Sequence, residues 1–193
     1  MRIIVRTTPD QTRHECVAYL HERLPDLELC VDRNYGRVDM PGYRKSALNM
    51  VAAMRMAEND AALHLEDDII LTVDFLRKVQ AALVGHEGEV VQFFSMRRAD
   101  HTIGSRYDSD FLMAQCFYTP AGVAAAIARF YPTWRPEHTI PDGDVLVRHW
   151  LKANGLRYWI HVPSLVQHRP TRSLINAKRS TARQSKTFTD PQL

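Results

Sequence analysis

The sequence has few cysteines, no long apolar run and no glycine-rich phosphate loop. Cys16, Cys30 and Cys116 lie far apart without CxxC spacing, which argues against a zinc site or a disulfide framework and favours a reducing compartment. No segment approaches the ~18 apolar residues of a membrane span. The apolar run at 1–6 is too short for the core of a signal peptide, so we expect a cytoplasmic protein.

Acids slightly outnumber bases over most of the chain, and net positive charge gathers at its end. The net charge is +3, yet residues 167–193 contain six Lys or Arg and one acid, Asp190, so this segment carries +5 and the remainder −2. Such a tail either binds phosphate on a nucleotide, a nucleic acid or a membrane surface, or is a solvated, partly disordered terminus. We expect one domain over 1–170, followed by a basic tail over 171–193.

Short apolar runs alternate with amphipathic segments along most of the chain. The clearest helix is predicted over 44–58, where apolar residues recur on one helical face. The polar stretch 97–110 lacks periodicity and is predicted to be a long loop. Other helices are predicted from about 8 to 25 and at 75–84, 120–130 and 144–153, and strands at 2–7, 27–31, 62–65, 89–94, 111–118 and 157–162. This alternation predicts an α/β sandwich with a mostly parallel sheet, in which ligands bind at the carboxyl ends of the strands.

Three adjacent carboxylates, Glu66, Asp67 and Asp68, follow the predicted strand at 62–65. Clustered like charges are unfavourable unless a positive group lies among them, and Mg²⁺ or Mn²⁺ prefers such oxygen ligands. The competing interpretation is a helix N-terminus, which acids also favour. His168, after the last predicted strand and a proline turn, could add a nitrogen ligand, although a single surface histidine usually has no such role.

Two further acids, Asp142 and Asp144, lie in a Pro-Gly loop before the predicted helix at 144–153. A carboxylate there could be a general base that deprotonates an acceptor hydroxyl. Aspartate is also a strong helix cap, and capping is the simpler interpretation of this segment alone.

Four segments, in the order in which they occur along the chain, resemble segments of the GT-A fold glycosyltransferases, in particular small enzymes related to families 2 and 25. Residues 44–49 (RKSALN) resemble the helix start that borders the nucleotide, and 65–68 (LEDD) resemble the DXD-type metal motif. Residues 143–157 resemble the "ED" segment with its following strand, and 163–168 (PSLVQH) resemble the closing "P-x-L-V-x-H". The resemblance covers about residues 3–173.

This resemblance implies a three-layer GT-A sandwich at 1–170 that transfers a sugar from a nucleoside diphosphate sugar, UDP-sugar favoured, to a hydroxyl group. Asp68 and His168 would hold Mn²⁺ or Mg²⁺, with Asp144, or else Asp142, as the catalytic base. The donor would contact Thr7, Thr8, Asp32, Arg44, Lys45, Asn49, Glu66, Asp67, Arg169 and Arg172. Two departures stand out: position 143 is glycine where the family often has glutamate, and the acidic run lacks the isolated central aspartate of a strict DXD.

The acceptor is less defined by the sequence. The loop with Arg97, Arg98, His101 and Arg106 could join the basic tail in a surface for an anionic acceptor. Small proteins of this kind resemble phage-encoded enzymes, which makes a hydroxymethylated pyrimidine in DNA a candidate acceptor beside a surface glycan.

Two other classes of protein remain open. The chain could be a non-catalytic nucleotide- or nucleic-acid-binding module whose acids serve as helix caps. A nucleotidyltransferase of similar layout would need a glycine-rich loop after the first strand, and Thr7-Thr8-Pro9 contains no glycine.

Overall fold

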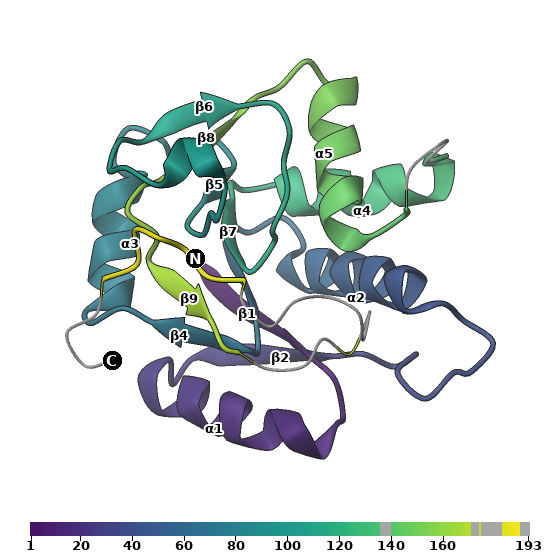
Figure 1. Cartoon of the computed structure of the whole chain (residues 1–193). Helices are drawn as coiled ribbons and strands as arrows, with labels where there is room; N and C mark the ends of the chain where they lie inside the picture. Colours follow the sequence, from purple (N-terminus) through teal and green to yellow (C-terminus); the bar gives the residue numbers. More distant parts are fainter. Residues whose placement is uncertain (136–139, 171–173, 175–182, 190–193) are drawn as a thin grey trace.

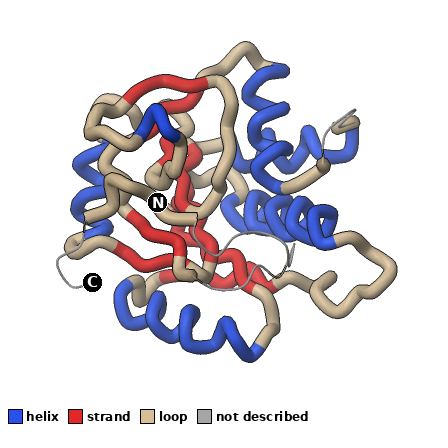
Figure 2. The backbone as a smooth tube through the Cα atoms, in the orientation of Figure 1, coloured by secondary structure: helices blue, strands red, loops and turns tan. Residues whose placement is uncertain are grey.

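The computed structural model describes residues 1–135, 140–170, 174 and 183–189. One seven-stranded sheet crosses the molecule, with helices on both faces (Figures 1 and 2). Its strands, in spatial order, are β2 (Leu27–Val31), β1 (Arg2–Thr7), β3 (Ala62–Glu66), β7 (Cys116–Thr119), β5 (Val91–Gln92), β8 (Tyr158–Ile160) and β6 (Arg106–Asp108). Five strands run in one direction, and β7 and β6 run against them. The predicted α/β sandwich with a mostly parallel sheet is therefore confirmed.

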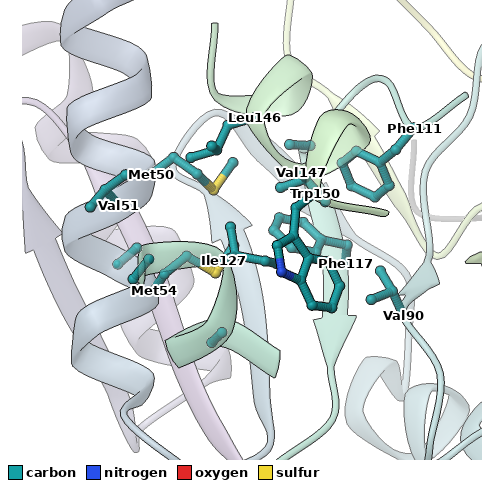
Figure 3. Close-up of a cluster of buried hydrophobic side chains, with 14 of the residues drawn as sticks. Met50, Val51, Met54, Val90, Phe111, Phe117, Ile127, Leu146, Val147 and Trp150 are labelled. Carbon is teal, nitrogen blue, oxygen red and sulfur yellow. The ribbon is translucent and has the colours of Figure 1, made fainter. Parts of the chain in front are cut away.

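Each face of the sheet is covered by its own set of helices. The helices are α1 (His14–Arg23), α2 (Gly42–Ala57), α3 (Phe75–Leu83), α4 (Val123–Phe130) and α5 (Gly143–Ala153), with short 3₁₀ helices η1 (Gln11–Arg13), η2 (Arg98–Asp100) and η3 (Tyr131–Thr133). Side chains alternate along β1, so that Ile4 packs under α2, α4 and α5 while Ile3 and Val5 pack under α1 and α3. Figure 3 shows the first cluster, in which Met50 and Met54 of α2 face Trp150 of α5.

A second, two-stranded antiparallel sheet was not predicted. It pairs β4 (Ile69–Leu71) with β9 (Val166–His168), and Ile69 lies opposite His168 in its register. Each strand has only three residues, which is too short for a periodic apolar pattern to be recognised.

Two sequence predictions were wrong in detail. The predicted strand at 89–94 is regular only at Val91–Gln92, although the Phe93 amide still donates to the Cys116 carbonyl of β7 at 3.0 Å. The predicted loop at 97–110 contains η2 and the edge strand β6. Ion pairs from Arg97 and Arg106 to the acids of this segment hold it in place. No helix among the described residues is long and apolar enough to cross a membrane.

His64 makes the fold sensitive to acid. The imidazole is fully buried in β3, stacks on Phe117 with ring centroids 4.8 Å apart and lies 3.1 Å from the Thr119 hydroxyl. Burial, together with the charge of Arg6, lowers the pKa of His64 from 6.5 to about 3. As the pH falls below 6.5, the unfolded chain therefore takes up a proton that the folded chain does not bind.

We expect the free energy of unfolding to fall by ~1.4 kcal/mol per pH unit from this group, or about 2 kcal/mol between pH 7 and pH 5. The measurement is urea unfolding at both pH values for the wild type and His64→Gln. The variant should lose less stability than the wild type on acidification. Equal losses in the two proteins would show that His64 is not the sensitive group.

Candidate functional site

A polar cleft of about 280 Å³ opens at the carboxyl ends of β1, β2 and β3, beside the first turns of α2. This edge of an open α/β sheet is where ligands usually bind. Eight of the predicted residues line it: Thr7, Thr8, Asp32, Lys45, Asn49, Glu66, Asp67 and Asp68. Lining residues that the sequence did not indicate include Arg6, Arg13, Tyr35, Ser46 and Arg183.

Asp68 and His168 converge beside this cleft, as expected. Asp68 Oδ2 lies 3.3 Å from His168 Nε2, and ligand atoms of Glu66, Asp68 and His168 all lie within 4.8 Å of one another. Two ligands of one Mg²⁺ or Mn²⁺ ion are at most about 4.4 Å apart when each bond is ~2.2 Å. Two carboxylates and an imidazole therefore fit such an ion after a small side-chain shift. Their role as metal ligands remains a prediction.

The β4–β9 pairing explains why these side chains meet. Asp68 immediately precedes β4, and Ile69 lies opposite His168. The Arg169 amide donates to the Asp68 carbonyl at 2.8 Å, which extends the pairing by one residue. His168 is fully buried, so the imidazole is fixed in place next to the acidic run.

Two arginines already supply positive charge to the acidic run, and a third contacts His168. Arg13 NH1 lies 2.8 Å from Asp68 Oδ2 and 3.5 Å from Asp67 Oδ1. Arg6 pairs with Glu66 at 3.1 Å, and Arg183 NH2 lies 2.7 Å from His168 Nε2. The argument that the carboxylates need a metal ion for charge balance is thus wrong. The fit of the ligand set, rather than the charge, supports an ion here.

Burial and neighbouring charge push the two aspartates in opposite directions. Burial, with the charge of Asp68 beside it, raises the pKa of Asp67 to about 6, against the opposing effects of Arg13 and the Thr7 hydroxyl. That hydroxyl donates to Asp67 Oδ2 at 2.6 Å. Burial also acts to raise the pKa of Asp68, but hydrogen bonding and charge from His168 and Arg13 outweigh it and lower the pKa. Asp68 is therefore the more firmly ionised carboxylate.

The opposite wall of the cleft is built by β2 and α2. Asp32 is buried at the end of β2, accepts from the Asn34 amide at 2.8 Å, and has its pKa raised chiefly by burial. Lys45 donates to the Tyr35 carbonyl at 2.7 Å, which fixes its ammonium beside the cleft. This end of the cleft offers both a carboxylate and a cation.

Two predicted donor contacts lie elsewhere, and a third is outside the described residues. Arg44 lines a separate pocket on the other side of the α2 N-terminus. The Arg169 guanidinium lies over the Tyr19 ring, 4.6 Å from its centroid, and Nε donates to the Ile69 carbonyl at 3.3 Å. Arg172 is not among the residues that the structure describes.

Asp142 and Asp144 lie at the start of α5, outside the lining of the cleft. Asp142 is the N-cap, and its Oδ1 accepts from the Gly143 amide at 2.6 Å and from the Ser46 hydroxyl at 2.5 Å. Its capping role is therefore confirmed. The half-buried Asp144 accepts from the Met113 amide at 3.2 Å.

The glycine at position 143 has a packing reason. A Cβ added there would lie 3.0 Å from Met50 Cβ and 3.4 Å from the Ser46 carbonyl oxygen. Close approach of α5 to α2 thus crowds any side chain at this position, and a larger residue would require α2 or α5 to shift.

The predicted acceptor loop has fewer available cations than its sequence indicates. Arg97 pairs with Asp108 at 2.6 Å, and Arg106 pairs with Asp100, also at 2.6 Å. Only Arg98 and His101 of the four predicted cations are exposed. The described part of the tail, 183–189, contacts the domain instead of standing apart, because Ser185 Oγ donates to Ser164 Oγ at 2.8 Å. The domain boundary at 170 remains a prediction.

No known family profile and no curated protein matches the sequence. Among solved structures, protein A197 from STIV superposes with a TM-score of 0.51 at 12% identity, over 86% of this chain and 84% of that one. A putative glucose-1-phosphate thymidylyltransferase from Bacillus anthracis has a TM-score of 0.49 at 9% identity (87% and 89% covered). An apo UDP-glucose pyrophosphorylase has 0.47 at 7% (83% and 72% covered). At such identities, the likeness to A197 shows a shared fold and no more.

Proposed function

We propose that the chain is a metal-dependent glycosyltransferase that uses a nucleoside diphosphate sugar, with a UDP-sugar favoured, and transfers the sugar to an acceptor hydroxyl. One observation carries the proposal: Glu66, Asp68 and His168 bring their ligand atoms within 4.8 Å of one another beside a polar cleft at the strand carboxyl ends. A bound Mn²⁺ or Mg²⁺ would neutralise charge on the departing nucleoside diphosphate.

The residues around the cleft suit the parts of such a donor. Thr7, Thr8 and Asp32 lie where the base and ribose would bind, with Lys45 and Asn49 beside them. Arg13 and Arg183 are placed to contact phosphate oxygens, to which guanidinium groups bind in a bidentate manner. In this arrangement Arg183, instead of the predicted Arg169, is the described tail-side arginine at the donor.

Asp144 is proposed as the base that takes the proton from the acceptor hydroxyl. Its partner Met113 belongs to the segment before β7, and the next residue, Ala114, accepts from Arg6 of the cleft at 2.8 Å. Asp144 is therefore one short segment away from the donor site. The proposed acceptor is a hydroxymethylated pyrimidine in DNA or a surface glycan.

A non-catalytic nucleotide-binding module is the second candidate, and the arginines favour it. Arg6, Arg13 and Arg183 contact Glu66, Asp67, Asp68 and His168, so side chains of the protein itself supply positive charge to this cluster. A protein that only binds nucleotides would need no metal ion at this cluster, because the arginines can bind phosphate.

Release of nucleoside diphosphate separates the two candidates. We expect the protein to release UDP from a UDP-sugar in the presence of Mn²⁺ and to stop when EDTA is added. The assay is a colorimetric measurement of the released nucleoside diphosphate over a panel of UDP-, GDP- and TDP-sugars, with Ca²⁺ as a matched divalent ion. Thermal stabilisation by a nucleotide without release of diphosphate at any ion concentration would instead establish the binding module.

A further inference from the structure

We propose that a second pocket, on the far side of the α2 N-terminus from the cleft, binds a nucleotide of the acceptor, and thus that the acceptor is a single-stranded or unpaired region of a nucleic acid. This inference rests on the proposed function, since it assigns the acceptor of that same reaction. The pocket has a volume of about 400 Å³ and is lined by three aromatic residues, two arginines, three prolines and Ala47.

The aromatic residues form a wall that is held in place. Trp134 is buried, and its Nε1 donates to His149 Nδ1 at 2.9 Å, which fixes the indole ring. The Tyr131 ring lies beside it, with centroids 6.1 Å apart. Tyr43 and Tyr131 are only half-buried, so their rings remain accessible to a ligand. Accessible aromatic rings on a rigid wall are the usual stacking surface for bases of single-stranded nucleic acids.

The two arginines make this pocket attractive to anions. Arg44 and Arg135 are both exposed, and within the described part of the chain neither has a carboxylate at ion-pair distance. Arg135 NH1 donates to the carbonyls of Pro132 and Trp134 at 2.9 and 3.0 Å, which holds its guanidinium at the pocket. Among the described residues that line the pocket, none is acidic. A neutral glycan would leave both charges unused, whereas a phosphodiester beside a stacked base uses them.

The position of the pocket fits an acceptor site. The first turns of α2 separate it from the cleft, because Tyr43 and Arg44 line the pocket while Lys45 and Ser46 line the cleft. Pro141, which lines the pocket, directly precedes Asp142, whose carboxylate accepts from Ser46. Asp142 thus connects a residue of the donor cleft, Ser46, with the segment that lines this pocket.

The test is the binding of a fluorescently labelled single-stranded oligonucleotide containing 5-hydroxymethylcytosine, followed by anisotropy without donor or metal ion. We expect Arg44→Ala/Arg135→Ala to weaken binding about tenfold at 50 mM salt and to reduce the slope of log K against log salt by about 1.4, for two phosphate contacts. Tyr43→Ala should weaken it at least fivefold, while Tyr43→Phe, which keeps the ring, should bind like the wild type.

Arg55→Ala/Arg157→Ala is the matched control, since it removes two positive charges from exposed sites that line neither the pocket nor the cleft. The inference is overturned if this control weakens binding as much as the pocket variants, if the wild type does not bind the oligonucleotide at 50 mM salt, or if a neutral oligosaccharide binds in a manner that depends on the same residues. Because donor and metal ion are absent, this outcome is independent of UDP release, which tests the proposed function by itself.

Discussion

Asp68→Asn is expected to reduce Mn²⁺-dependent UDP release by roughly 10³-fold, which corresponds to about 4 kcal/mol of transition-state stabilisation lost with the ion. The carboxylate is buried, firmly ionised and 3.3 Å from His168 Nε2. Asparagine keeps the shape of the side chain but removes the charge that an ion requires. The measurement is UDP release together with Mn²⁺ affinity from isothermal titration calorimetry.

Asp74→Asn is the control for this change. Asp74 is an exposed acid at the start of α3, where it pairs with Arg77, and it does not line the cleft. This variant should release UDP at the wild-type rate. Thermal unfolding of both proteins shows whether Asp68→Asn is folded at the assay temperature. Wild-type Mn²⁺ affinity in a folded Asp68→Asn protein would contradict the metal assignment.

Arg183→Met supplies a contrast at the same site. The Arg183 guanidinium lies 2.7 Å from His168 Nε2. An incoming ion that binds Nε2 must displace this guanidinium. Removing that competitor should tighten Mn²⁺ binding about tenfold while Asp68→Asn weakens it. Opposite shifts from two neighbouring positions are difficult to attribute to a general loss of folding.

The sequence located the acidic half of the site but not its arginines. Three carboxylates after an apolar strand are a local pattern, so Asp68 could be identified without the fold. No local pattern in the sequence marks Arg13 as a site residue. It is far from Asp68 in the sequence, and only the folded chain brings η1 next to the acidic run. Arg6 did offer one: a charged residue within a strand predicted to be buried requires a partner, and Glu66 of the neighbouring strand is that partner.

The layered fold followed from local apolar patterns, while strand pairing did not. The alternation of Ile3, Ile4 and Val5 between two cores is visible in the sequence as a continuous apolar run. The apolar run at 89–94 gives a regular strand only at Val91–Gln92, with one further backbone hydrogen bond from Phe93 to Cys116, because apolarity reports contact with the core and not the hydrogen-bonding partner. The convergence of Asp68 with His168 depends on such a partner, the short β4–β9 pair.

The identity of the base is tested by exchanging each aspartate at the start of α5 for asparagine. Asp142 Oδ1 accepts from both the Gly143 amide and the Ser46 hydroxyl, at 2.6 and 2.5 Å. A carboxylate oxygen that already accepts two hydrogen bonds is a poor proton acceptor. In Asp142→Asn the amide oxygen can still accept both of these hydrogen bonds. Asp144 bonds to the amide of Met113, whose φ of 66° is uncommon for a residue with a side chain and marks a tightly constrained segment.

We therefore expect Asp144→Asn to reduce sugar transfer by 10²–10⁴-fold, the usual contribution of a general base, and Asp142→Asn to reduce it less than tenfold. Transfer is measured to an oligonucleotide containing 5-hydroxymethylcytosine, and donor affinity by calorimetry in the presence of Mn²⁺. Donor affinity should be unchanged in both variants, because neither carboxylate lines the cleft. A large loss of transfer in Asp142→Asn with a normal rate in Asp144→Asn would reverse the assignment. Asp142 caps the helix and Asp144 does not. That result would therefore mean that the Asp142 carboxylate leaves the cap when the acceptor binds.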